Sequence, residues 1–344
     1  MNRYALLVRP SANRVYEGDA PRLAAAELQL FGDAALGGRI GDIETVELGG
    51  VPYLTFTCDG LDDSDVAALS HLSSVFALFE LDAGRLTPIT LTSPDRLPDD
   101  VITIPKYRGK TNEQFTRLLF NVTVLSSAFA SELLDRRFRV LDPLCGRGTT
   151  LNQAIVLGHD AAGIDLDERD VEAYATFIRR WMKDHRIKHR AEFAPVRRNN
   201  RTVGKRLRIS FAATKDQFRA GDVQQLDVLA ADTVDALEFH RPGSFDVIVT
   251  DAPYGVQHGS RTVTKGLRRD PLDLLREAAP VWVQLLRSGG AVGMAWNTKV
   301  AGRAEAADVL ASAGLDVFDD DAHRAFVHRV DASIQRDVLL ARRR

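Results

Sequence analysis

The sequence has few cysteines and lacks a long apolar run. Its two cysteines, Cys58 and Cys145, lie far apart and have no histidine partners at metal-ligand spacing. Two distant cysteines exclude a disulfide scaffold, and we expect no structural metal site. Free cysteines are typical of a reducing compartment, which predicts a cytoplasmic location. No segment approaches the roughly 18 consecutive apolar residues of a membrane helix, so we expect no membrane association. The N-terminal residues 4–8 are typical of a strand rather than a signal peptide.

Charge divides the 344-residue chain into two parts. Residues 1–105 carry 7 Lys/Arg against 16 Asp/Glu, a net charge of −9, and the remaining 38 against 31 give +7. A composition of 45% hydrophobic and 27% charged residues is that of a globular protein long enough for two domains. We expect only the second part to attract a polyanion. The acidic first part could instead meet a protein partner or a second copy of the chain.

The first part predicts a small ferredoxin-like α+β domain over residues 1–91. Its pattern reads strand, helix, two strands, helix, strand, over residues 4–8, 21–31, 43–48, 53–57, 65–75 and 76–81, with further strand at 86–91. No catalytic constellation is visible in it. Residues 92–110, with three prolines, predict a linker to a second domain over 111–344. Thr111 and Gln114 match a capping box, which predicts Thr111 as the N-cap of a helix that extends to about Phe129.

The segment 138–150 predicts a ligand-binding loop. A short apolar strand leads into Asp142, and Gly146 and Gly148 precede a helix that begins at Thr149. Glycines let a ligand approach the backbone, and free amides at a helix start can hold a carboxylate. Asp165 ends the next strand, where a carboxylate suits ribose hydroxyls. Cys145, inside the loop, and Leu166, after Asp165, complete this part of the candidate cofactor site.

These features alone leave the cofactor open. A nicotinamide-binding loop follows the same logic, although residues 146–151 lack the third glycine of that motif. Residues 218–222 predict a short third strand, which would place Asp222 and the Val223 amide at the edge of an adenine. The alternative is that Asp222 is an ordinary surface acid.

Residues 245–255 carry the candidate catalytic motif. A buried strand, residues 245–249, is followed by Asp251, Ala252, Pro253 and Tyr254. The Asp251 carboxylate and the Ala252 carbonyl can accept hydrogen bonds from an amino group, and Tyr254 can stack on a planar base. The alternative is a strand followed by an Asp/Pro turn.

Two basic segments are candidates for binding nucleic acid. Twelve cations lie between residues 179 and 208, opposed by two acids, and alternation predicts an inserted β-hairpin at about 186–212. Residues 258–269 contain four cations and no acid, which predicts a basic lid. The alternative is that the hairpin is a charged, solvent-exposed extension with no ligand. The candidate contacts are Arg197, Arg198, Arg201, Lys205 and Arg206 in the hairpin and Arg261, Lys265, Arg268 and Arg269 in the lid.

The second domain resembles class I, Rossmann-like amino-methyltransferases that use S-adenosylmethionine, with a C-terminal β-hairpin around residues 331–333. It is most similar to the catalytic domain of THUMP-associated tRNA guanine-N2 methyltransferases. The resemblance rests on the segments 108–117, 142–149, 163–165, 251–255 and 328–336. In that family the positions matching Gly146, Gly148 and Thr149 line the methionine end of the cofactor. Those matching Asp165 and Asp222 hold its ribose and adenine.

The resemblance implies methyl transfer to an exocyclic base amino group, most simply guanine-N2 of tRNA, without a metal. The chain departs from the family pattern at two points. Ala252 replaces the first proline of the Asp-Pro-Pro-Tyr motif, and residues 92–110 are too few for a THUMP domain. A DNA adenine-N6 or cytosine-N4 methyltransferase, or a binding protein that retains the fold without catalysis, are the alternatives.

Overall fold

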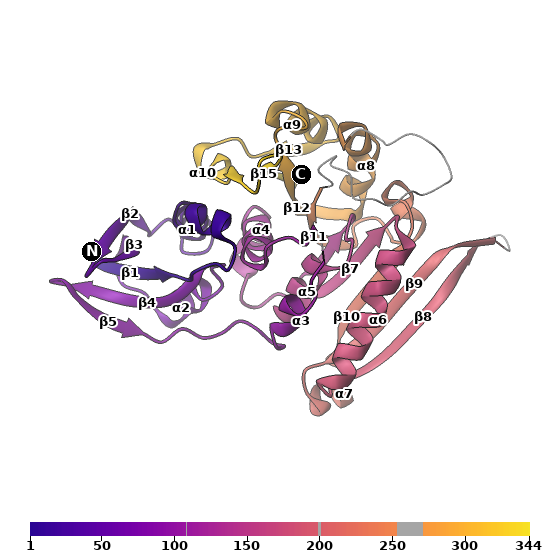
Figure 1. The fold of residues 1–344 in the computed structure, drawn as a ribbon, viewed down its shortest axis with the longest axis horizontal. Helices are drawn as coiled ribbons and strands as arrows, with labels where there is room; N and C mark the ends of the chain where they lie inside the picture. Colours follow the sequence, from indigo (N-terminus) through magenta and orange to yellow (C-terminus); the bar gives the residue numbers. More distant parts are fainter. Residues whose placement is uncertain (108, 199–200, 253–270) are drawn as a thin grey trace.

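The computed structural model describes residues 1–107, 109–198, 201–252 and 271–344. The strands in these ranges form two sheets, one near each end of the long axis of the molecule (Figure 1). The sheets correspond to the two predicted units. No helix within the described ranges is both long enough and apolar enough to cross a membrane.

The first unit is an antiparallel sheet with two helices. The strand order is β2-β3-β1-β4-β5, so the first four strands follow the ferredoxin-like order and β5 extends the edge beside β4. The ferredoxin-like prediction is therefore confirmed. Its elements are β1 (Asn2–Val8), α1 (Arg14–Ala34), β2 (Gly41–Leu48), β3 (Val51–Cys58), α2 (Asp63–Leu69), β4 (Val75–Asp82) and β5 (Arg85–Ile89).

Helix α1 is longer than the sequence predicts. The Asn13 side chain accepts hydrogen bonds from the amides of Val15 and Tyr16 and so caps the helix about two turns before Pro21. Pro21 then lies inside the helix, where it removes one backbone donor. Leu23, Leu28 and Phe31 on the inner face of α1 are fully buried, and this packing accommodates the lost bond.

The second unit is built on a ten-stranded sheet. Its helices and strands are α3 (Asp100–Thr103), α4 (Glu113–Leu125), η1 (Ala130–Glu132), β6 (Arg139–Asp142), α5 (Thr149–Val156), β7 (Asp160–Asp165), α6 (Glu168–Asp184), β8 (Lys188–Arg198), β9 (Arg201–Ala212), α7 (Lys215–Ala220), β10 (Gln224–Ala230), η2 (Thr233–Glu238), β11 (Phe245–Asp251), α8 (Pro271–Leu285), β12 (Leu286–Asn297), α9 (Arg303–Ser312), β13 (Leu315–Val317), α10 (Asp321–Arg324), β14 (His328–Arg329) and β15 (Gln335–Arg343).

The strand order confirms the class I α/β fold. The order is β13-β15-β12-β11-β6-β7-β10-β9-β8, and strands β12, β11, β6, β7 and β10 are parallel neighbours. The long strand β15 runs antiparallel to β12 and also pairs with the short β14. The predicted terminal hairpin is therefore present, with β14 limited to two residues.

The third parallel strand is not where the sequence analysis placed it. Residues 215–220 form α7, which Thr214 and Gln217 close with a reciprocal capping box, and the strand is β10. The prediction of a strand over 218–222 is therefore wrong. Its cause is local, because Phe218 alone suggested a buried strand, whereas the cap at Thr214 commits this segment to a helix.

The basic hairpin continues the main sheet. Residues 206–211 of β9 pair with residues 224–229 of β10, with Arg206 opposite Leu229, and β8 forms the outer edge. Because β10 ends at Ala230, which the register places level with Lys205, residues 201–204 extend beyond it by roughly 14 Å at 3.4 Å per residue. Figure 1 shows the hairpin as the long ribbon that leaves the sheet beside α6.

Helices cover both faces of the sheet. Helices α4, α5 and α6 contribute Phe115, Leu151 and Val171 to one buried cluster, and η2, α8 and α9 contribute Ala236, Leu275 and Leu310 to a second. The segment predicted as a linker packs against the first of these layers. Its Leu97 and Val101 are buried, and Asp100 accepts a hydrogen bond of 3.0 Å from the indole of Trp181.

Buried polar contacts join the two units. Helix α1 packs against α4, and the fully buried Glu27 of α1 accepts a hydrogen bond of 2.7 Å from Asn121 of α4. Glu27 also accepts from the Ser73 amide and hydroxyl. Burial raises the pKa of Glu27. The satisfied carboxyl fixes the orientation of α1 on the second unit.

Candidate active site

Four acidic residues follow the carboxyl ends of four adjacent strands. Strands β11, β6, β7 and β10 are neighbours, and Asp251, Asp142 and Asp165 are the last residues of the first three. Asp232 follows the end of β10 by two residues. The parallel register places Asp165 opposite Ala230 and Asp142 opposite Gly163. The acids therefore share one edge of the sheet, which is where open α/β folds bind ligands.

Asp165 is held by the predicted glycine loop. One carboxylate oxygen accepts the Gly146 amide at 2.7 Å, and the other accepts the Asp167 amide at 2.8 Å. Burial raises the pKa of Asp165 to about 6, although both amide bonds oppose this shift. An ionised carboxylate has about four acceptor sites, so it can receive hydroxyl donors in addition to these two amides. The geometry suits a pair of ribose hydroxyls.

Asp142 lies deeper in the same edge. Its carboxylate accepts hydrogen bonds from the Thr250 hydroxyl at 2.8 Å and from the Leu144 amide at 3.2 Å. Burial raises its pKa to about 7, and the charge of Asp165 contributes to the same shift. A buried acid with this raised pKa favours a nearby cation, because a cation would stabilise the ionised form.

The start of α5 has the features of an anion site. Its N-cap is Gly148, which has no side chain to cap the first helical amides, and the first turn contains no acid. Gly148 has φ +79°, and a Cβ there would lie 2.4 Å from the ring of Tyr174. At Gly146, φ is +48° and a Cβ would meet nothing within 4 Å, so this side of the loop is open. The glycines thus serve both close packing and ligand access.

The other predicted residues of this loop have structural roles. The Thr149 hydroxyl forms a hydrogen bond of 2.7 Å with the Tyr107 hydroxyl. Cys145 is buried, its amide donates to the Ile164 carbonyl at 2.9 Å, and burial raises the pKa of its thiol. Leu166 is 68% exposed directly after Asp165. An exposed leucine beside the ribose position offers an apolar surface to a planar base.

Asp222 and Val223 lie at the opposite edge of the sheet. They precede β10, whose amino end adjoins the amino end of β7, where the Gln225 amide donates to Asp160 at 2.8 Å. Arg137 binds both residues, through the Asp222 carboxylate and the Val223 carbonyl. The placement of Asp222 beside an adenine is therefore wrong. Asp232 follows the corresponding strand end, and the apolar residues 228–231 before it were the signal in the sequence for this strand.

Two distant segments meet at Asp251. The Thr111 hydroxyl donates to Oδ2 of Asp251 at 2.5 Å, and an Arg336 guanidinium nitrogen lies 3.4 Å from the same oxygen. The Arg336 side chain is only 6% exposed and stacks over the Phe115 ring at 4.4 Å. The prediction that Thr111 is the N-cap of α4 is wrong. Asn112 caps α4 through the Phe115 amide, and this leaves the Thr111 hydroxyl for Asp251.

Ala252 is held by a backbone hydrogen bond. Its amide donates to the Ala295 carbonyl of β12 at 3.1 Å, which continues the ladder after the Asp251–Ala295 pair. The residue is buried. Proline at this position could not donate that bond, because it has no backbone N–H. The hydrogen bond therefore restrains residue 252 in this chain, where the motif of the related enzymes has a proline.

The remaining candidate catalytic and nucleic-acid-binding residues lie only partly within the described ranges. Pro253, Tyr254 and the four lid cations Arg261, Lys265, Arg268 and Arg269 lie outside the described residues. In the hairpin, Arg197 is exposed near the tip, and the backbones of Arg198 and Arg201 pair with each other.

Two of the predicted contact residues are used inside the protein. Lys205 forms ion pairs with Glu168 and Glu172 of α6, and Arg206 forms a two-nitrogen contact with Asp227. Lys205 and Arg206 therefore fasten the base of the hairpin to its neighbours. The prediction that Lys205 and Arg206 bind phosphate is corrected here, because both side chains form ion pairs with carboxylates of the protein.

Comparison with known families identifies the second unit. Residues 130–294 match the family model UPF0020, described as RMKL-like, methyltransferase domain. This segment is a methyltransferase domain. It contains the loop, Asp142, Asp165 and Asp251, so the match confirms the methyltransferase predicted from the sequence and agrees with S-adenosylmethionine as its cofactor. Curated proteins gave no match to the chain.

Several solved structures match the chain at low sequence identity. TrmN from Thermus thermophilus is 12% identical, with a TM-score of 0.44 and full coverage of both chains. A candidate RNA methyltransferase from Pyrococcus horikoshii is 13% identical, with a TM-score of 0.40 over 72% of this chain and 90% of that one. The N-methyltransferase NodS from Bradyrhizobium japonicum is 14% identical, with a TM-score of 0.40 over 67% and 94%. The functional argument therefore rests on the family match and the chain's own residues.

Proposed function

We propose that the protein methylates an exocyclic amino group of a base in RNA, with guanine-N2 of tRNA as the target. One observation carries this proposal. Asp251 and Ala252 lie at the same edge of the sheet as the glycine loop before α5 and the carboxylate of Asp165. A methyl-donor site and an amino-acceptor site on neighbouring strands can bring the reacting atoms together.

The residues present suit S-adenosylmethionine. The uncapped amides at the start of α5 and the open side of Gly146 suit its carboxylate. Asp165 suits the ribose hydroxyls, while Leu166 and Asp232 lie where the adenine would rest. The buried Asp142, with its raised pKa, favours the positively charged methionine end. When bound, this cofactor supplies an electrophilic methyl group on a sulfonium.

Asp251 and Ala252 act on the acceptor. A base amino group is a poor nucleophile, because its lone pair is delocalised into the ring. The Asp251 carboxylate and the Ala252 carbonyl can each accept one of its N–H groups, which favours a pyramidal nitrogen and stabilises positive charge that develops on it. The proton can leave after transfer, so the mechanism does not require a base to remove it first.

Thr111 and Arg336 position Asp251. Both contact Oδ2, and Arg336 is held in place by its burial and by the Phe115 ring. These contacts fix one carboxylate oxygen before substrate arrives, so binding does not have to order the side chain. The Ala252–Ala295 hydrogen bond does the same for the neighbouring carbonyl.

The choice of RNA and guanine is supported by the motif resemblance at residues 108–117 and 328–336. These segments supply Thr111 and Arg336, which both contact Asp251. The same machinery could serve adenine-N6 or cytosine-N4 in DNA, so the experiment must offer both nucleic acids.

The test is methyl transfer from radiolabelled S-adenosylmethionine to bulk tRNA, ribosomal RNA and DNA, followed by mass spectrometry of the nucleosides. We expect N2-methylguanosine in tRNA. Label in DNA alone would replace the proposal with the DNA alternative. Cofactor binding by calorimetry without transfer to any of the three would indicate a binding protein.

A further inference from the structure

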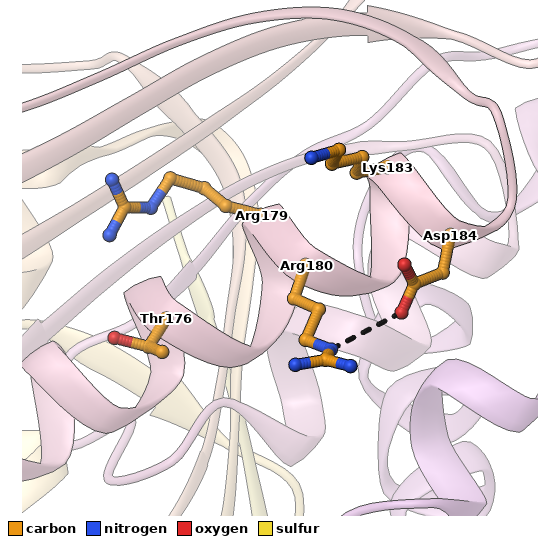
Figure 2. Close-up of a pocket in the computed structure, with 5 residues that line it drawn as sticks. All are labelled: Thr176, Arg179, Arg180, Lys183 and Asp184. Atoms are coloured by element: carbon orange, nitrogen blue, oxygen red, sulfur yellow. Dashed lines mark hydrogen bonds and ion pairs between the residues drawn. The ribbon is translucent and has the colours of Figure 1, made fainter.

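The outer face of α6 presents a hollow that the proposed chemistry does not use. Thr176, Arg179, Arg180, Lys183 and Asp184 line it, all from the second half of the helix. Figure 2 shows the cationic side chains projecting from successive turns. Positions 176, 180 and 183 recur at helical spacing, so they lie on one face. Thr176, Arg179, Arg180 and Lys183 are all exposed.

Internal contacts leave most of this charge available. Arg180 and Asp184 lie 3.4 Å apart with 82% and 59% of their side chains exposed, and water screens such an exposed pair so that it holds the Arg180 side chain only weakly. Arg179 uses one donor on the Ala175 carbonyl at 2.8 Å, and its guanidinium lies over the Phe193 ring of β8. A guanidinium has five N–H donors, so the others can bind a planar oxyanion.

The charge surplus continues into the start of the hairpin. Residues 179–190 contain six Lys/Arg and one acid, Asp184. Arg186, Lys188 and Arg190 are exposed in this stretch. A cation in the last turn of a helix also stabilises the helix dipole, and this accounts for Lys183 alone. Arg190 lies over the Phe218 ring of α7, a contact that leaves its positive charge in place.

The first half of α6 is different. Its acids are matched by cations from elsewhere, as Asp170 pairs with Arg147 at 2.8 Å and Glu168 pairs with Lys205 at 2.7 Å. Charge along the helix is therefore arranged in two zones. The zone beside the cofactor edge is neutralised, and the zone farther from it is positive.

We propose that the second half of α6 binds the phosphodiester backbone of the RNA. This inference rests on the proposed function and names the surface that holds the same substrate. Arg179 lies eleven residues after Glu168, or about 16 Å along the helix axis. This surface would thus bind phosphates several nucleotides away from the base at Asp251. The edge of the sheet that carries Asp251 could not contact those phosphates by itself.

The test compares two triple variants with equal loss of charge. The first replaces Arg179, Arg180 and Lys183 by serine. The control replaces Arg14, Arg85 and Arg219, which are exposed and lie on α1, β5 and α7. Binding of tRNA is measured by fluorescence anisotropy from 50 to 300 mM salt, and methyl transfer is measured in parallel.

Three lost phosphate contacts should reduce the slope of log K against log salt by about 2 to 3, since each contact contributes about 0.7 to 0.9. Affinity at 0.1 M salt should fall on the order of 100-fold for the α6 variant, and the control should keep the wild-type slope. Equal slopes in the α6 variant and the wild type would overturn the inference, as would equal loss in both variants.

The two proposals fail in different ways. If the wild type binds tRNA through α6 but transfers no methyl group to it, the proposed function fails and the docking surface stands. If the wild type methylates tRNA and the α6 variant binds and methylates equally well, the docking surface fails and the function stands.

Discussion

Replacing Thr111 by valine tests the positioning of Asp251. Valine keeps the branched shape of threonine and removes only the hydroxyl that donates to Asp251 at 2.5 Å. A hydrogen bond to a charged group contributes about 1.5–3 kcal/mol. If this bond is needed in the transition state, kcat should fall about 10- to 150-fold at 1.36 kcal/mol per tenfold. The affinity for S-adenosylmethionine should not change, because Thr111 contacts the acceptor side.

The assay is single-turnover methyl transfer to tRNA, with cofactor affinity measured separately by calorimetry. Thr111→Ser is the matched control, because it restores the hydroxyl and should recover most of the rate. A double-mutant cycle with Arg336→Gln then reports whether the two residues act through the same carboxylate. Wild-type kcat in Thr111→Val would refute the positioning role. If Thr111→Ser lowered kcat as much as Thr111→Val, the effect would come from packing and not from the hydroxyl.

Three further perturbations test other parts of the account. Gly148→Ala should destabilise the protein by about 2–5 kcal/mol in urea unfolding, because its Cβ would lie 2.4 Å from the Tyr174 ring at φ +79°. Gly37→Ala, with φ +65° and no atom within 4 Å, is its control and should show only the backbone strain. Cofactor affinity should fall about tenfold between pH 8 and pH 6, because the raised pKa values of Asp142 and Asp165, about 7 and about 6, let both acids take up protons in this range. The same raised values favour the folded apo protein as pH falls, so calorimetric affinity and thermal stability should change in opposite directions, and Asp165→Asn should weaken both trends and leave the part due to Asp142. Glu27→Ala should lower stability by about 2–4 kcal/mol, because Ser73 and Asn121 lose their buried acceptor, whereas an unchanged urea midpoint would show that α1 is held by apolar packing alone.

Features set by local pattern were predictable from the sequence. The loop from Asp142 to Thr149 and the strand end at Asp165 combine short apolar runs with glycines at fixed offsets, and the structure places them as expected. The ferredoxin-like order and the terminal strand pair follow from similar alternation. These signals span only a few residues each, so tertiary context had little opportunity to override them.

Contacts between distant segments were not predictable in the same way. Thr111 has the sequence of a helix cap, and only the fold shows that Asn112 caps α4 while Thr111 faces Asp251. Arg336 meets the same carboxylate from a strand 85 residues later. A basic run likewise does not show which cations are already paired, and so Lys205 and Arg206 looked available for phosphate.

The placement of Asp222 shows how an incorrect strand boundary moves a site. Consecutive parallel strands point the same way. When a strand is predicted too early in the sequence, the residue taken for its carboxyl end is in fact at its amino end. The residue then lies on the wrong edge of the sheet. Asp232, after the apolar run of β10, follows the same pattern as Asp165 and Asp251.

The central claim is that Asp251 promotes methyl transfer to a base amino group in RNA. The most direct measurement compares wild type with Asp251→Asn, using labelled S-adenosylmethionine, tRNA and nucleoside mass spectrometry, after calorimetry has shown equal cofactor binding. The account predicts N2-methylguanosine from the wild type and at least a hundredfold less from Asp251→Asn. Equal methylation by the two proteins, or methylation of DNA alone, would contradict it.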